Sequence, residues 1–129
     1  MAMEYPGKNT ALILVDPYND FMSSKGKAWP MVKKVAKQVN LIAHMEAITE
    51  RCREQGWVIA YAPHHRFKKG SFSDRKYLHP SQILQKMSAS FKADSFGSEF
   101  YESVQPLEGD IISSEHDCSS GFTGTDLHE

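Results

Sequence analysis

The stretch "TALILVDPYNDF" (residues 10–21) decides the fold, because it joins an apolar strand pattern to a carboxylate. Residues 10–15 form a short apolar run, which is typical of a strand buried on both faces of a parallel sheet. The run ends at Asp16. Ligands of open parallel sheets bind outside the carboxyl ends of the strands. Asp16 is therefore the first candidate for a functional residue.

A long amphipathic helix is predicted after this strand and its polar loop. Pro30 suits the first helical position, and apolar residues then recur at three- and four-residue steps as far as Cys52. Gly56 is a typical C-terminal stop. The pattern predicts one continuous helix.

Two further strands are predicted at residues 57–62 and 110–114, with a short helix at 80–88 between them. Strands that alternate with helices indicate an α/β fold with a parallel sheet, and right-handed crossovers place the three strands in the order 3-2-1. The first strand then lies at an edge, although it carries no lysine, proline or charge to protect it. We expect residues after 129, or another chain, to pair with it. The final "TDLHE" (125–129) has the pattern of a helix start, which also leads us to expect further residues after 129.

The composition is that of an ordinary globular domain. The chain has 129 residues, a formal net charge of -1 and 40% hydrophobic residues, so no nucleic-acid partner is expected. No apolar run approaches the roughly twenty residues that span a membrane. The N-terminus lacks the pattern of a secretory signal, which predicts a cytoplasmic location with reduced thiols. Cys52 and Cys118 form neither a metal motif nor a convincing disulfide framework.

Polar side chains follow each of the predicted strands. Asp16 follows the first, His64 and His65 the second, and Glu115 and His116 the third. A carboxylate and imidazoles in one crevice can carry out acid-base catalysis or hold a metal. The alternative is that Asp16 caps the following loop and the histidines are solvated loop residues. The spacing alone leaves both interpretations open.

Three segments together resemble the isochorismatase-like cysteine hydrolases, a group that includes nicotinamidases and N-carbamoyl amidases. They are "LILVDPYNDF" (12–21), "HHR" (64–66) and "SSEHDCSSGFTGTDL" (113–127), which occur in the family's own order and cover essentially the whole chain. The resemblance implies a three-layer α/β/α, Rossmann-like fold with a six-stranded parallel sheet. Residues 1–129 would then form a single domain truncated on its C-terminal side, with only the first half of that sheet.

The resemblance also implies a mechanism that uses an aspartate, a lysine and a cysteine nucleophile, without a cofactor. Asp16 matches the aspartate, which acts as general base toward the thiol. His116 occupies the lysine position, six residues before Phe122, and this is a departure from the family. Proximity to Asp16 would favour a protonated His116, which could still assist a thiolate. The nucleophile of the family follows the fourth strand, which would come after residue 129.

Other residues have two interpretations each. Phe21, Trp29 and His64 could line a substrate pocket, whereas the alternative for the two aromatic residues is that they pack the first loop. His64 and His65 could bind a metal, as in the nicotinamidase branch, but the accompanying aspartate pattern is absent, so no metal site is predicted. Cys118 is a candidate substitute nucleophile because it lies two residues from His116, but it matches a non-catalytic position of the family.

Two functions remain open. The first is a hydrolase that acts on a small amide or vinyl-ether substrate by cysteine-dependent covalent catalysis, with Asp16 as general base. The second is a catalytically incompetent, truncated form that works by associating with another chain. A phosphatase of the haloacid dehalogenase type is set aside, because Tyr18 stands where that class needs a second aspartate. We expect a small-molecule substrate, no membrane or nucleic-acid partner, and a homo-oligomer.

Overall fold

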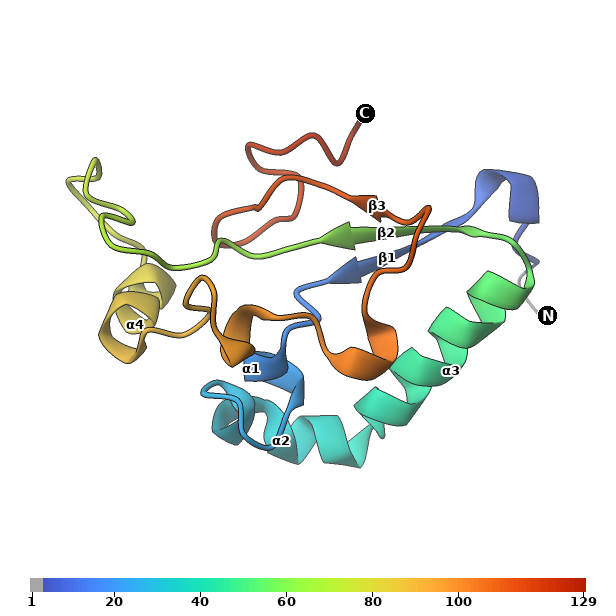
Figure 1. The fold of residues 1–129 in the computed structure, drawn as a ribbon, viewed down its shortest axis with the longest axis horizontal. Coiled ribbons are helices and arrows are strands. Elements are labelled where there is room, and N and C mark those ends of the chain that lie inside the picture. Colours follow the sequence, from blue (N-terminus) through green and yellow to red (C-terminus); the bar gives the residue numbers. More distant parts are fainter. Residues whose placement is uncertain (1–3) are drawn as a thin grey trace.

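The computed structural model describes residues 4–129 and contains a sheet of three parallel strands (Figure 1). These are β1 (Ala11–Val15), β2 (Val58–Ala62) and β3 (Ile111–Ile112), with β2 in the middle. The predicted α/β class and strand order are confirmed. The third strand is shorter than predicted, although the Ser113 amide, just beyond it, still donates to the Tyr61 carbonyl at 3.0 Å.

Helices occupy the connections between the strands. They are α1 (Asn19–Met22), α2 (Trp29–Gln38), α3 (Leu41–Glu54) and α4 (Pro80–Ser88), and the short 3-10 turns are η1 (Gly7–Asn9), η2 (Phe96–Ser98) and η3 (Glu102–Val104). The predicted helix at 80–88 is confirmed. Within residues 4–129, none of the helices has the length and apolar character needed to cross a membrane.

The prediction of one long helix from Pro30 to Cys52 is wrong, because the chain turns between α2 and α3. Asn40 has a φ of 50°, in the left-handed region, and a right-handed helix cannot run through it. Asparagine tolerates this conformation better than most residues, and apolar periodicity does not reveal it. Gly56, with a φ of 66°, follows α3 as predicted.

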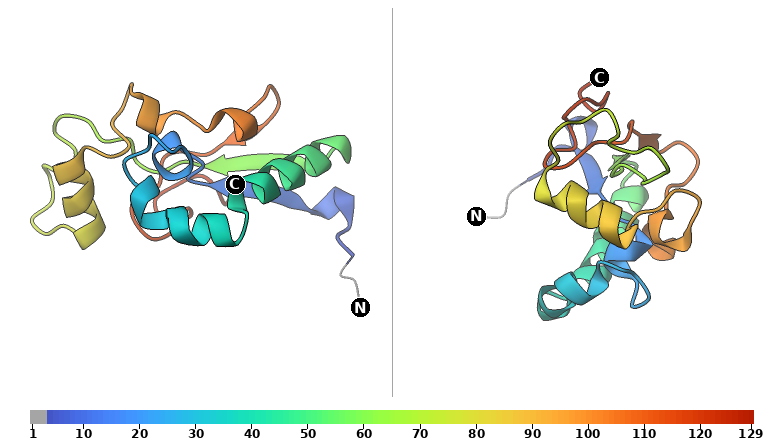
Figure 2. Two further views of the ribbon diagram at one scale, coloured as in Figure 1. Left: turned by 90° about the horizontal axis from the view of Figure 1, so that it is seen from below. Right: turned by 90° about the vertical axis from the view of Figure 1, so that its left-hand side faces the viewer.

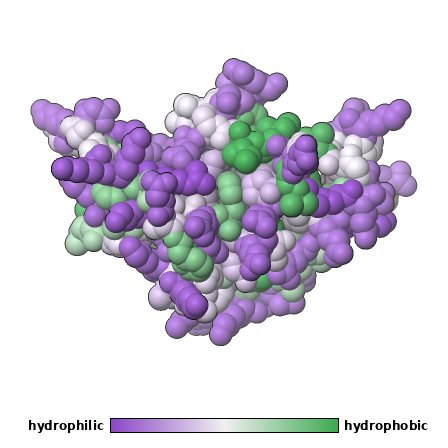
Figure 3. All heavy atoms as spheres, viewed as in Figure 1, coloured by the Kyte–Doolittle hydropathy of each residue, from purple (hydrophilic) through white to green (hydrophobic). Residues whose placement is uncertain are grey.

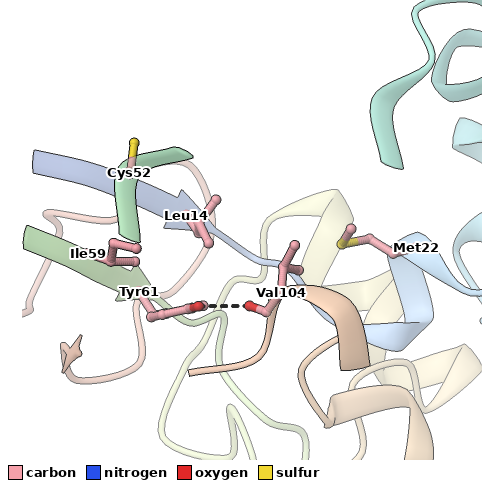
Figure 4. Close-up of a cluster of buried hydrophobic side chains, with 6 residues drawn as sticks. All are labelled: Leu14, Met22, Cys52, Ile59, Tyr61 and Val104. Atoms are coloured by element: carbon pink, nitrogen blue, oxygen red, sulfur yellow. Dashed lines mark hydrogen bonds between the residues drawn. The ribbon is translucent and has the colours of Figure 1, made fainter. Parts of the chain in front are cut away.

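The core lies on one face of the sheet, where α3 packs. Alternation along the strands points Leu14, Ile59 and Tyr61 toward this face. The buried apolar cluster contains Leu14, Met22, Cys52, Ile59, Tyr61 and Val104 (Figure 4). The Tyr61 hydroxyl donates to the Val104 carbonyl at 2.8 Å, so the largest side chain of the cluster is also satisfied as a donor.

An ion pair fixes the end of α3 to the start of β3. The Arg53 guanidinium contacts both carboxylate oxygens of Asp110, at 2.9 and 2.7 Å. A hydrogen bond from Arg53 and partial burial have opposite effects on Asp110, and the hydrogen bond is the larger, so the pKa of Asp110 lies below its usual range. This bidentate contact aligns β3 beside β2.

The opposite face of the sheet carries exposed apolar side chains in the described part of the chain. Ile13 and Val15 of β1, Val58 of β2 and Ile111 of β3 are each more than 40% exposed. Figure 3 shows apolar surface gathered where β3 lies in Figure 1. Within residues 4–129, β1 is paired on one side only.

The last residues form a turn rather than a helix. The Asp126 carboxylate accepts hydrogen bonds from the amide and the hydroxyl of Ser114, at 2.7 and 3.1 Å. No helix begins at Thr125 in the described residues; its hydroxyl donates to the Gly121 carbonyl. The "TD" pair therefore holds this segment against the end of β3.

Leu14 and Ile13 provide a matched test of which sheet face is the core. Leu14 is 5% exposed and Ile13 is 41% exposed. Leu14→Ala is expected to lower the free energy of unfolding by about 3 kcal/mol, because it leaves a cavity, whereas Ile13→Ala is expected to lower it by less than about 1 kcal/mol. Urea unfolding followed by circular dichroism measures both. Equal losses would contradict the assignment of the core to one face.

Candidate active site

The carboxyl ends of the strands are joined by hydrogen bonds that continue beyond the regular sheet. The Asp16 amide donates to the Ala62 carbonyl at 3.1 Å. His65 and His116 extend the pairing of β2 with β3, because the His65 amide donates to the His116 carbonyl at 2.8 Å and the His116 amide to the Pro63 carbonyl at 2.9 Å. These contacts bring three chain segments together at one edge of the sheet.

Asp16 and His116 meet at this edge, although 100 positions separate them in sequence. His116 Nε2 lies 2.7 Å from Asp16 Oδ1. His116 is buried, with 3% of its surface exposed, while the Asp16 side chain keeps 24% of its surface open. A carboxylate that is partly open to solvent and held by a buried imidazole can accept a proton from a ligand.

Both ring nitrogens of His116 face oxygen atoms. Nδ1 lies 2.5 Å from the Asp117 carbonyl, and Nε2 faces Asp16. A carbonyl and an ionised carboxylate only accept hydrogen bonds, so both nitrogens must carry protons when the two bonds form together. A doubly protonated ring would donate through both nitrogens at once, and a lysine at this position would also present N–H donors to Asp16.

The backbone at Asp16 turns sharply. Asp16 has a φ of 55°, and the Tyr18 amide donates to the Asp16 carbonyl at 2.7 Å. Aspartate is among the few residues that tolerate this left-handed conformation. The turn ends β1 and leaves the carboxylate at the edge of the sheet.

The two adjacent histidines have different surroundings. The His64 ring lies 5.3 Å from the His116 ring and 5.0 Å from the Phe91 ring, measured between centroids. His65 instead contacts the Ser71 hydroxyl with Nε2. Burial lowers the pKa of His65, so its imidazole is neutral at pH 7. His64 therefore belongs to the site and His65 to the loop behind it.

Glu115 holds the strand ends in register. Its carboxylate accepts from the Arg66 amide at 2.8 Å and pairs with the Arg66 guanidinium at 2.7 Å. The guanidinium also lies 4.9 Å from the centre of the Tyr18 ring. Burial raises the pKa of Glu115, but the hydrogen bonds and charge of Arg66 outweigh it, so this pKa lies below its usual value. The position of Glu115 after the third strand could be predicted from the sequence, but its pairing with Arg66 could not.

The first loop is held by the polar residues of "NDF". The buried Asp20 carboxylate accepts from the Lys27 amide at 2.9 Å and from the Phe91 amide at 2.6 Å. A Cβ added to Gly97 would lie 2.4 Å from Asp20 Oδ2, so only glycine fits there. Asp20 therefore has a structural role, joining the loop after α1 to the segment before η2.

Phe21 and Trp29, the two aromatic residues predicted to line the pocket, have different surroundings in the structure. Phe21 is half-buried and stacks on Phe91, with ring centroids 4.7 Å apart, and Phe91 in turn contacts His64. Trp29 is half-buried at the start of α2. Phe21 thus reaches the site only through the ring of Phe91. Of its two interpretations, packing of the loop is the one that these contacts support.

The two cysteines have unlike positions. Cys52 is 4% exposed in the core cluster with Leu14, which suits a structural residue. Cys118 is half-buried in the segment after His116, and its amide donates to the Asp117 carboxylate. Among residues 4–129, no group of three or more metal-ligating side chains is arranged to hold a metal ion.

The fold and the paired Asp16 and His116 define an α/β protein with a polar site at the carboxyl edge of its parallel sheet. Residues 10–129 match the family model of the Isochorismatase domain, so the chain belongs to the isochorismatase family of hydrolases. A comparison with curated proteins gave no match.

Solved structures of this family show the same fold. A cysteine hydrolase from Pseudomonas syringae pv. phaseolicola 1448A has 18% identity and a TM-score of 0.64, covering 98% of this chain and 55% of its own. N-carbamoylsarcosine amidase from Thermoplasma acidophilum has 23% identity and a TM-score of 0.58, covering 92% and 57%. An isochorismatase from Pseudomonas putida KT2440 has 21% identity and a TM-score of 0.55, covering 97% and 52%. The chain thus spans about half the length of these structures.

The Glu115 contact predicts how stability depends on pH. Because the pKa of Glu115 is lowered in the folded state, its contribution is complete above the unfolded value of about 4 and is lost as the pH falls through the folded value. Urea unfolding between pH 7 and pH 3 is expected to show a smaller loss of stability on acidification for Glu115→Gln than for the unchanged protein. Glu108→Gln, at an exposed site, is the control. Identical pH dependence in all three proteins would contradict this assignment.

Proposed function

We propose that the chain carries the acid-base part of a cysteine-dependent hydrolase site that acts on small amide or vinyl-ether substrates. The observation that carries this proposal is the 2.7 Å contact between Asp16 and His116 in a chain of the isochorismatase family. Asp16 acts as general base, and His116 takes the place of the family's lysine. No cofactor is needed for this chemistry.

For an amide substrate, the thiol transfers its proton to Asp16, and the thiolate attacks the carbonyl carbon. The C–N bond then breaks as Asp16 passes the proton to the leaving nitrogen, which gives a thioester and an amine. Asp16 next takes a proton from water, whose oxygen attacks the thioester, and the thiol is released with the acid product. Asp16 is open enough to exchange protons with a ligand, and the 2.7 Å contact with His116 Nε2 holds its carboxylate in place.

The proposed substrate class rests on the names of the structural relatives. One is an N-carbamoylsarcosine amidase and another an isochorismatase, so an N-carbamoyl or other small amide and a vinyl ether are the two classes to test. Phe21, Trp29 and His64 are proposed to contact the substrate. His64 has the strongest support of the three, because its ring lies against that of His116. We also propose a cytoplasmic location.

Neither cysteine of the described residues stands where the family places its nucleophile. The family resemblance assigns it to a helix start after a fourth strand, whereas β3 is the last strand of the described residues. Cys52 is buried in the core, and Cys118 is half-buried in the segment after His116, before any helix start. We therefore expect residues 1–129 alone to give no turnover.

A second candidate function is association with another chain, including a second copy. The exposed apolar face of the sheet and the unpaired side of β1 favour this candidate, since both normally lie against other structure. In this case the chain would form a single truncated domain that works through its partner, as a homo-oligomer or in a mixed assembly. Sedimentation equilibrium of residues 1–129 tests it: a monomer at micromolar concentration would contradict self-association.

Hydrolysis assays test the first proposal. Release of ammonia from N-carbamoylsarcosine, and of pyruvate from an enolpyruvyl ether, would be measured with the product of the natural gene and with residues 1–129. In an active protein, Asp16→Asn is expected to lower kcat by roughly 10²–10⁴-fold, because a general base is lost. His116→Lys is expected to retain more activity than His116→Ala.

Asp74→Asn is the matched control, because Asp74 is exposed on the loop before α4. Turnover by Asp16→Asn at the rate of this control would contradict the role of Asp16. Absence of turnover in the natural gene product with both probes would contradict the hydrolase proposal and favour association.

A further inference from the structure

Asp117 connects His116 to a segment that is distant in sequence. Its Oδ1 accepts from Gln82 Nε2 of α4 at 2.7 Å and from the Cys118 amide at 2.9 Å. The Arg75 guanidinium, from the loop before α4, pairs with Oδ2. Figures 1 and 2 show α4 at one end of the molecule, beyond the carboxyl ends of β1 and β2. Asp117 is therefore the point where this outlying segment meets the segment after β3 that carries His116.

The main chain of Asp117 contacts the imidazole directly. Its carbonyl oxygen lies 2.5 Å from His116 Nδ1, on the side of the ring away from Asp16. The direction of this carbonyl decides which way the ring is turned, and so whether Nε2 points at Asp16. A side chain that fixes the Asp117 peptide therefore fixes the Asp16 contact as well.

The orientation of Gln82 follows from its other hydrogen bond. Gln82 Oε1 accepts from the His79 amide at 2.9 Å, as part of the capping box of α4. With its oxygen used there, the amide nitrogen must face Asp117. Gln82 is 4% exposed, so both ends of this buried side chain are satisfied. This is a specific arrangement rather than a surface contact.

The charge of Asp117 is maintained by the same partners. Burial raises the pKa of Asp117, but the hydrogen bonds from Gln82 and Arg75 outweigh it, so this pKa lies below its usual range. The carboxylate is ionised at neutral pH and accepts from all of its donors. Arg75 also lies 5.4 Å from the centre of the Phe72 ring, which orients the guanidinium.

We propose that Asp117, clamped by Gln82 and Arg75, is a positioning residue that holds the His116 imidazole toward Asp16 and couples residues 67–88 to the candidate active site. The proposal goes beyond the proposed function. It concerns the orientation of His116 and holds whether or not a substrate is turned over.

Nuclear magnetic resonance of the full 129-residue chain, labelled with ¹⁵N in its histidine rings, tests the proposal. The His116 signals are assigned by their absence in His116→Gln. The unchanged protein is expected to show ring N–H protons of His116 that exchange slowly with water, because the ring is buried and both nitrogens face acceptors. Asp117→Ala and Arg75→Ala are expected to raise that exchange rate roughly fivefold or more, as one net hydrogen bond is lost.

Two further variants separate positioning from general stability. Gln82→Glu keeps an oxygen for the His79 amide but removes the donor to Asp117, so it should also speed exchange at His116. Arg75→Lys keeps the positive charge, so its His116 ring N–H should exchange slowly, as in the unchanged protein and unlike in Arg75→Ala. Lys76→Ala, the neighbouring cation with no contact to Asp117, is the matched control and should leave the His116 signals unchanged.

The result that overturns the proposal is a folded Gln82→Glu or Arg75→Ala whose His116 exchange equals that of the unchanged protein. Equal acceleration in Lys76→Ala would also overturn it, since the effect would then be general. Circular dichroism shows whether each variant is folded. If Gln82→Glu does not fold, the comparison of Arg75→Ala with Arg75→Lys decides.

Discussion

The hydrogen bond between Asp16 and His116 joins the carboxyl ends of β1 and β3 across the central strand. It forms only if several separate conditions hold. β1 must end in a left-handed turn at Asp16, β2 and β3 must keep their pairing past the regular sheet as far as His65 and His116, and the imidazole must be turned with Nε2 toward the carboxylate. The left-handed turn, the extended strand pairing and the contacts around His116 each meet one of these conditions.

Two carboxylates flank His116 in sequence, and each is held by an arginine. Glu115 is paired with Arg66 on one side, and Asp117 with Arg75 on the other. Both negative charges are thus neutralised locally, which leaves Asp16 as the carboxylate in contact with the imidazole. This arrangement suits a site in which one carboxylate exchanges protons while its neighbours serve structure.

Apolar patterning and the carboxyl ends of the strands predicted the sheet and the meeting of Asp16 with His116, whereas a local backbone turn and the partners of the loop residues were not predicted. The apolar runs predicted the strands, right-handed crossovers predicted their order, and Pro80 marked the start of α4. The break at Asn40 was missed because apolar periodicity continues through a residue whose backbone conformation differs. The pairing of Arg66 with Glu115 was not predicted, because the two residues lie 49 positions apart in the sequence. The role of Asp16 and His116 in catalysis stays a prediction.

A double-mutant cycle between Asp16 and His116 tests the central contact most directly. The free energy of unfolding would be measured in urea at pH 7 for the unchanged chain, Asp16→Asn, His116→Gln and the double variant. A charge-assisted hydrogen bond predicts a coupling of about 1 to 3 kcal/mol between the two substitutions. Losses that add within about 0.3 kcal/mol would contradict the account, because the two side chains would then not interact.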